Sequence, residues 1–250
     1  MKITILKVAH AGEREPRKLL SYIKECDAFS VEWAGCYEPH AEKFESIWLT
    51  LLGKADRITR SGFLQIYDTT LMSDTNEPFT FRQYKRAIFD YMFVNRVPLC
   101  FTERWQAEGY SKNVMSAYRL GTSNAKNGLE LLKDGKEEGL RRAYEGWKLA
   151  FNSVAERDRN IAANLGRMES LLKTRYPHLA ERNIKLCVAI GHSHQVEKHA
   201  EVECVELMDM SDPVTRLVVR MEDMAYNHAP FEDASPLLRE LAPYVNKIFV

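Results

Sequence analysis

The chain has 250 residues, of which 45% are hydrophobic and 28% charged, and this composition is typical of a globular protein that can bury a sizeable core. Lys plus Arg and Asp plus Glu number 35 each, so no net charge favours phosphate backbones or anionic lipids. We therefore expect neither a nucleic-acid partner nor a membrane partner.

The five cysteines are scattered, odd in number and without a CxxC pair, which argues against a disulfide framework or a cysteine zinc site. Buried thiols in a reducing compartment are the favoured interpretation. The N-terminus enters a predicted strand at once, and no apolar run approaches membrane-spanning length. We predict a cytoplasmic protein, and the sequence leaves its oligomeric state open, a homo-oligomer included.

The first half of the chain alternates predicted strands and helices. An apolar run over 3–9 ends at His10, a helix starts near Pro16, and a second apolar run over 28–31 ends at Glu32. Two strands joined by one helix should be parallel. Further on we predict helices over 41–52 and 80–95, an irregular strand over 63–67, and a third strand over 97–101 that is followed by Thr102, Glu103 and Arg104.

The amino-acid composition changes in the middle of the chain. Residues 121–139 are rich in Gly, Asn and Lys, and this composition predicts a mobile surface connection flanking a short helical piece, with a lid over a site as the alternative. Residues 140–172 then show a long helical apolar stripe that Asp158 interrupts. Either Asp158 is paired or faces a polar cavity, because an isolated buried charge is costly, or the helix breaks there.

The last apolar strand, over 184–190, leads directly into Gly191-His192-Ser193-His194. A further strand over 202–208 and helices over 214–223 and 237–248 follow, the helices starting at Asp212-Pro213 and Ser235-Pro236. Together these patterns predict a single α/β domain over 1–250, with a mainly parallel central sheet flanked by helices and an additional mostly helical middle region.

Ligands of open α/β sheets gather at the carboxyl ends of the strands. His10, Glu32, Arg104 and His194 all follow predicted strands, so we expect them on one rim of the sheet. Two histidines and a glutamate make a suitable open metal site, and the predicted metal ligands are His10, Glu32 and His194. The predicted ligand-binding residues are Glu103, Arg104, Gly191 and His192. The chain contains no P-loop, no GxGxxG and no GxSxG motif.

The order of these motifs resembles the TraB/PrgY/GumN family, which is distantly related to Tiki proteases, erythromycin esterases and ChaN-like haem-binding proteins. His10 matches the first GxxH motif, Glu32 the glutamate after the second strand, and Gly191 with His194 the second GxxH. Glu156, Arg157 and Asp158 match the ER[DN] element. One departure is Lys7, which stands where the first family motif has glycine.

The resemblance implies different activities in different branches: metal-dependent peptidases, esterases that use histidine and glutamate, haem binding, and regulation. Our leading hypothesis is a peptidase- or esterase-like hydrolase that uses a divalent ion, Mn, Co or Zn, with Glu32, Glu156, Arg157 and Asp158 as catalytic residues. In it Arg157 orients Glu32 or stabilises an oxyanion, and Asp158 holds that arginine. The alternative is a non-catalytic protein that binds a small molecule, a peptide or haem.

Overall fold

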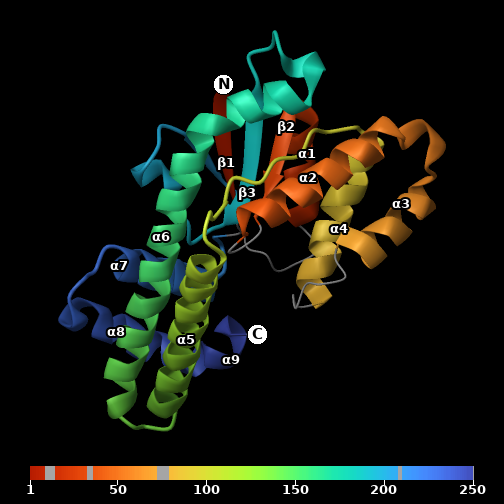
Figure 1. The fold of residues 1–250 in the computed structure, drawn as a ribbon. Helices are drawn as coiled ribbons and strands as arrows, with labels where there is room; N and C mark the ends of the chain where they lie inside the picture. The colour runs from red at the N-terminus through yellow and green to blue at the C-terminus, as the bar shows by residue number, and fades with distance from the viewer. Residues whose placement is uncertain (9–14, 33–35, 72–78, 208–209, 250) are drawn as a thin grey trace. The chain divides into compact units, whose positions relative to one another are not determined.

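The computed structural model describes residues 1–8, 15–32, 36–71, 79–207 and 210–249 (Figure 1). Its Cα atoms cluster into two compact units, each described by itself below. The first unit comprises Met1–Gln106, Ile161–His192 and Val196–Met208, and the second comprises Ala107–Asn160, Ser193–Gln195 and Asp209–Val250. The single domain over 1–250 stays a prediction.

A parallel sheet forms the centre of the first unit. Its strands are β1 (Lys2–Val8), β2 (Ala28–Val31), β3 (Lys185–Gly191) and β4 (Glu203–Glu206), in the order β2-β3-β1-β4. Each neighbouring pair is parallel. The predicted α/β class is therefore confirmed, and the late strand β3 lies between the two early strands β1 and β2.

The predicted strand over 97–101 lies beside β2, but as an extended segment with a single parallel bridge, between Phe29 and Leu99. The amide of Phe29 donates to the carbonyl of Pro98 at 2.9 Å, and the amide of Cys100 donates to the carbonyl of Phe29 at 3.1 Å. Pro98 has no N–H to give, which helps to keep this pairing short.

Side chains of the strands alternate between two apolar layers. Cys187 and Ala189 of β3 face one layer, together with helices α1 (Glu15–Glu25), α2 (Glu38–Gly53), α3 (Arg60–Ile66) and α4 (Phe79–Val94). Leu186, Val188 and Ile190 face the other layer, which holds the C-terminal part of α6 (Glu138–Arg175). The predicted strand over 63–67 is wrong, because Phe63 lies within α3 and buries its ring against Trp48 and Phe93.

The two edges of the sheet differ. On the β4 side, the ammonium of Lys2 lies 2.9 Å from the carboxylate of Glu203, and that of Lys7 lies 3.5 Å from the carboxylate of Glu206. On the β2 side, the extended segment that contains Pro98 covers the strand. Among the described residues, no helix is both long and apolar enough to cross a bilayer.

The second unit is helical. It contains α5 (Glu108–Lys133), α6 up to Asn160, α7 (Pro213–Tyr226), α8 (Phe231–Leu241) and α9 (Val245–Ile248), around one apolar core. Asp212 caps α7 by accepting a hydrogen bond from the amide of Thr215 at 3.0 Å, as the Asp-Pro pair predicts. The start predicted at Ser235-Pro236 is wrong: α8 already begins at Phe231, and Pro236 lies inside it.

The structure contradicts the surface connection predicted over 121–139. Helix α5 continues to Lys133, α6 begins at Glu138, and both run side by side (Figure 1). A Cβ atom on Gly121 or Gly128 would collide with the backbone of α6, and one on Gly146 would collide with the backbone of α5. These glycines therefore permit the close approach of two helices, although Gly121 and Gly128 belong to the segment whose composition predicted a mobile connection.

We expect Gly128→Ala to destabilise the protein by about 1–3 kcal/mol, because the added methyl group would have to push the two helix backbones apart. Gly166→Ala, in the same helix α6, is the matched control: its Cβ would meet open space, so a change between neutral and about 1 kcal/mol more stable is expected. Urea unfolding of both variants measures the difference. Equal stability of the two variants would contradict the close helix contact.

Candidate functional site

In the first unit, the carboxyl ends of β1, β2 and β3 meet as the sequence predicts. Glu32 directly follows β2, and its amide donates to the carbonyl of Ala189 at 2.9 Å. The amide of His192 donates to the carbonyl of Val8 at 3.0 Å, so β1 and β3 end together. The convergence of strand ends that underlies the predicted rim is thus confirmed for these three strands.

The carboxylate of Glu32 is anchored at this rim. Its Oε2 accepts a hydrogen bond of 2.7 Å from the amide of Gly191, the last residue of β3. A charge-assisted hydrogen bond from a backbone amide holds a carboxylate in place more firmly than a bond from a flexible side chain would. Glu32 is half-buried, so a carboxylate is held at the sheet edge where ligands of such sheets gather.

Lys7 is buried in β1. Its ammonium donates to Glu197 at 2.6 Å and lies 3.5 Å from Glu206. Burial alone would lower the pKa of Lys7, but the hydrogen bond and charge of Glu197 and the charge of Glu206 raise it above its usual value. Lys7 is therefore held as a cation by the elements that follow β3.

The second unit contains a buried acid–imidazole pair. Asp158 is completely buried and His194 is 2% exposed, and the Nδ1 atom of His194 is hydrogen-bonded to Oδ1 of Asp158. Helix α6 runs through Asp158 without a break, so the paired alternative holds and the helix break is wrong. The charge that interrupts the apolar stripe is thus explained by its partner.

Two further donors hold the carboxylate of Asp158. The hydroxyl of Tyr226 donates to its Oδ2 at 2.9 Å, and the amide of Gln195 donates to the same oxygen at 2.7 Å. Burial alone would raise the pKa of Asp158, but the charge and hydrogen bond of His194 and the bonds from Gln195 and Tyr226 hold it below its usual value. Asp158 is therefore an anion that fixes the histidine ring.

This pairing has a chemical consequence for His194. A carboxylate at Nδ1 holds the proton of the neutral ring on that nitrogen, so the lone pair lies on Nε2. An imidazole prepared in this way acts either as a general base or as a metal ligand whose ring a carboxylate orients. The arrangement therefore fits both forms of the hypothesis, the metal-dependent and the metal-free hydrolase.

Tyr226 and Gln195 were not predicted as site residues. Tyr226 lies 68 positions from Asp158, at the end of α7, and an amphipathic helix usually carries aromatic residues for packing alone. The only signal in the sequence was Asp158 itself, because a charge on an apolar stripe requires buried partners.

The remaining predicted catalytic residues lie on the same turn of α6. Arg157 is buried and Glu156 is half-buried. Asp158 was predicted to hold Arg157, whereas the partners seen at its two oxygens are His194, Gln195 and Tyr226. The catalytic roles of Glu156 and Arg157 stay predictions.

Arg104 and Glu103, predicted to bind a ligand, are buried within the first unit. Arg104 donates from Nη2 to Glu45 at 2.6 Å, and Glu45 also pairs with Arg175 and accepts from the amide of Phe101 at 2.7 Å. Burial lowers the pKa of Arg104. Glu103 accepts from the indole of Trp105 at 3.0 Å. These contacts give Arg104 a structural task, and ligand binding by Glu103, Arg104, Gly191 and His192 stays a prediction.

The predicted metal ligands are placed unequally. His10 lies outside the described residues, Glu32 belongs to the first unit and His194 to the second. Within the described ranges no group of three or more His, Cys, Asp or Glu side chains is arranged to hold a metal ion. The donor types still fit a divalent ion, because Asp158 orients His194 in the way that carboxylates orient metal-bound histidines.

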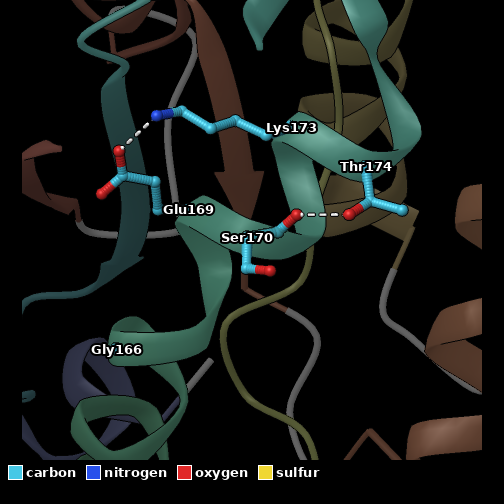
Figure 2. A pocket seen from close by; sticks show the side chains of 5 residues that line it. All are labelled: Gly166, Glu169, Ser170, Lys173 and Thr174. Carbon is cyan, nitrogen blue, oxygen red and sulfur yellow. Dashed lines mark hydrogen bonds and ion pairs between the residues drawn. The ribbon is translucent and has the colours of Figure 1, made fainter. Parts of the chain in front are cut away.

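A surface hollow on α6 contains none of the predicted site residues. Figure 2 shows its lining, which consists of Gly166, Glu169, Ser170, Lys173 and Thr174. Lys173 pairs with Glu169 at 2.9 Å, and the hydroxyl of Thr174 donates to the carbonyl of Ser170 at 2.8 Å. The charged groups of this hollow, Glu169 and Lys173, are paired with each other on the helix. The hollow therefore provides no further functional group for the site.

Comparison of the chain with protein-family models, with curated proteins and with solved structures finds no match.

We expect Tyr226→Phe to lower the stability at neutral pH by about 1.5–3 kcal/mol, because it removes a bond to a buried anion. The pKa of Asp158 is depressed, so its contribution is present above the usual value of 3.8 and is lost as the pH falls through the folded-state value below it. The difference between variant and wild type should therefore shrink below pH 3.8 in urea titrations. Tyr244→Phe, an exposed tyrosine, should change nothing.

We expect Glu45→Gln to destabilise the protein by about 3–5 kcal/mol, because Arg104 would keep its charge in a buried place without its main partner. Glu137→Gln is the control, since Glu137 pairs with Arg239 at the surface, and it should leave the unfolding midpoint unchanged. Similar midpoints for both variants would contradict the structural task of the Glu45 cluster.

Proposed function

We propose that this protein is a hydrolase, peptidase- or esterase-like, whose reactive centre is built on His194. The observation that carries the proposal is the buried pair of His194 and Asp158, with Tyr226 and Gln195 bound to the same carboxylate. A buried ion pair is weak evidence for stability, since apolar residues of similar volume often stabilise as well. The presence of a buried pair that stability alone does not require therefore supports a chemical task.

In this proposal the Asp158 carboxylate keeps His194 in one tautomer and one orientation. In the metal-dependent form of the proposal, Nε2 of His194 would bind the ion. In the metal-free form, Nε2 instead accepts a proton from the attacking water and returns it to the leaving group. Asp158 stabilises the imidazolium that forms in between. Tyr226 and the amide of Gln195 keep Asp158 an anion, which is consistent with its lowered pKa.

The proposal also uses Glu32, a carboxylate of the first unit. The bond from the amide of Gly191 fixes its Oε2, which suits a group that has to hold a water or an ion in one place. We propose His10, Glu32 and His194 as the ligands of a divalent ion, Mn, Co or Zn. When bound, such an ion lowers the pKa of a coordinated water and polarises the scissile carbonyl.

The motif order that resembles the TraB/PrgY/GumN family supports the same proposal, since Tiki-like members are metal-dependent peptidases. The resemblance includes both His194 and Glu32. Within their own units, His194 is bound by Asp158 and Glu32 by the amide of Gly191. We further propose that the substrate is a small molecule or a peptide. We also propose that the protein forms a homo-oligomer.

The test starts with elemental analysis of protein purified without chelator or affinity metal. We expect about one equivalent of a transition metal, which His10→Ala and His194→Ala should lose. Hydrolysis of a panel of fluorogenic peptides and activated esters is then measured with that metal restored. Without any metal in the wild type, the same panel tests the metal-free form of the proposal.

On the best substrate of this panel, Glu32→Gln, His194→Ala and Asp158→Asn should each reduce kcat/KM by about 10²–10⁴. Asp223→Asn is the matched control: the carboxylate of Asp223 accepts a hydrogen bond from the side-chain amide of Gln195 at 3.2 Å, and the variant should keep full activity. Full activity of Glu32→Gln or His194→Ala, with unchanged circular dichroism, would refute the proposal. Haem binding with a Soret shift that His10→Ala abolishes would favour the non-catalytic alternative.

A further inference from the structure

Helix α5 of the second unit carries a row of cations. Lysine or arginine recurs at every seventh position along it, at Lys112, Arg119, Lys126 and Lys133. Seven residues make almost two helical turns, so these four side chains lie along one side of α5, over a length of about 32 Å. The row drifts around the helix by only about 20° per step. The charges of the whole chain sum to zero, and this sum conceals the local concentration of positive charge.

The contact between α5 and α6 leaves the cation row on the outer side of α5. A Cβ atom on Gly121 or Gly128 would collide with the backbone of α6, so these glycines mark the side of α5 that faces α6. Arg119 and Lys126 each stand two positions before one of these glycines, which is about 200° around the helix. All four cations are exposed or half-exposed. The row therefore faces away from α6.

Few acids balance the cation row. Between Glu108 and Glu130, α5 contains three of the cations and no acid. Lys112 pairs with Glu108 at 2.6 Å. Within the part of the chain that the structure describes, the other three cations of the row form no ion pair. Their charge is therefore available to an anionic partner.

The side chains beside the cations indicate the class of partner. Ser116 and Ser123 are exposed, and each lies one turn after a cation of the row. Tyr110 and Leu120, the large hydrophobic side chains that α5 exposes, lie about 200° and 100° around the helix from the nearest cation in the sequence. Binding to a bilayer or to an apolar protein surface needs such side chains on the contact face. Lysine, arginine and serine are instead residues that contact the phosphates of nucleic acids.

The length and straightness of the row suit a duplex. The cations follow one another at intervals of about 10.5 Å on a continuous helix. The major groove of B-DNA is about 12 Å wide and admits an α-helix, whereas the major groove of duplex RNA is deep and narrow. A helix that lies along the DNA groove would bring its cations to the phosphates that border the groove.

We propose that the outer side of α5 binds the phosphate backbone of double-stranded DNA, independently of the base sequence. Lys112, Arg119, Lys126 and Lys133 neutralise three or four phosphates, and the serines beside them donate hydrogen bonds to phosphate oxygens. This surface uses no residue of the proposed reactive centre. A net charge of zero argued against a general nucleic-acid binder, and a local row of cations supplies the attraction that the whole chain lacks.

The test measures the fluorescence anisotropy of a labelled DNA duplex of about 20 base pairs, titrated with the whole chain. We expect binding at about 50 mM salt, with an affinity that falls by about 40- to 150-fold at about 200 mM. The reason is that three or four neutralised phosphates give a slope of about −2.7 to −3.6 in log affinity against log salt. A second duplex of unrelated sequence should bind with the same affinity.

Variants with one charge removed separate the row from the total charge. Arg119→Gln should make the slope shallower by about 0.9, and the double variant with Lys126→Gln by about 1.8. Arg220→Gln is the matched control: Arg220 is exposed on α7, forms no ion pair among the described residues, and its loss changes the net charge equally. This control should keep the slope of the wild type. Urea unfolding should give the same midpoint for all of these surface variants.

The wild-type titration decides the question even if a variant fails to fold. Absence of binding to the duplex at about 50 mM salt would overturn the proposal. Equal slopes for Arg119→Gln and Arg220→Gln would overturn it as well, because the binding would then follow the total charge. Tighter binding to an RNA duplex of the same length, or binding to phosphatidylserine vesicles and not to DNA, would assign the row to another polyanion and reject the proposal.

Discussion

The structure depends on the pairing of β3 with a strand on each side. β1 and β2 are neighbours in the sequence, yet β3, more than 150 residues later, separates them in the sheet. The register of β3 with both strands sets where each one ends, and so it places the carboxylate of Glu32 against the amide of Gly191. Because a shift of one residue would exchange the two faces of β3, the apolar layers on both sides maintain the register that the rim requires.

Buried charge is handled in the same manner in both units. Glu45 in the first unit and Asp158 in the second are completely buried, and each carboxylate accepts from a backbone amide as well as from cationic or polar side chains. The difference lies in the partner. Arginine cannot give up its proton in a protein, so the Glu45 cluster is inert, whereas histidine titrates near neutral pH. This contrast in partner chemistry is why the reactive centre is proposed at the pair of Asp158 and His194 rather than at Glu45.

Sequence patterns were reliable where burial alone determines structure. The apolar runs before Glu32 and Gly191 predicted parallel strands whose ends converge, and the misplaced charge of Asp158 predicted a buried partner. The predictions from sequence patterns failed where one residue type occurs in two kinds of structure. The glycines of α5 allow close packing, although their composition also fits a loop, and Pro236 sits in a helix where it was expected at the start of one. Tyr226 could not be found, since contacts between distant helices leave no periodic trace in a single chain.

The edges of the sheet bear on how copies of this chain could assemble. The β4 edge is four residues long, begins and ends with glutamate, and has lysines paired to both acids, while the β2 edge is occupied by the segment around Pro98. Short charged edges and covered edges discourage the addition of a foreign strand. These edges consequently favour association of copies through surfaces of side chains, which would leave the hydrogen-bond ladder of each sheet unchanged.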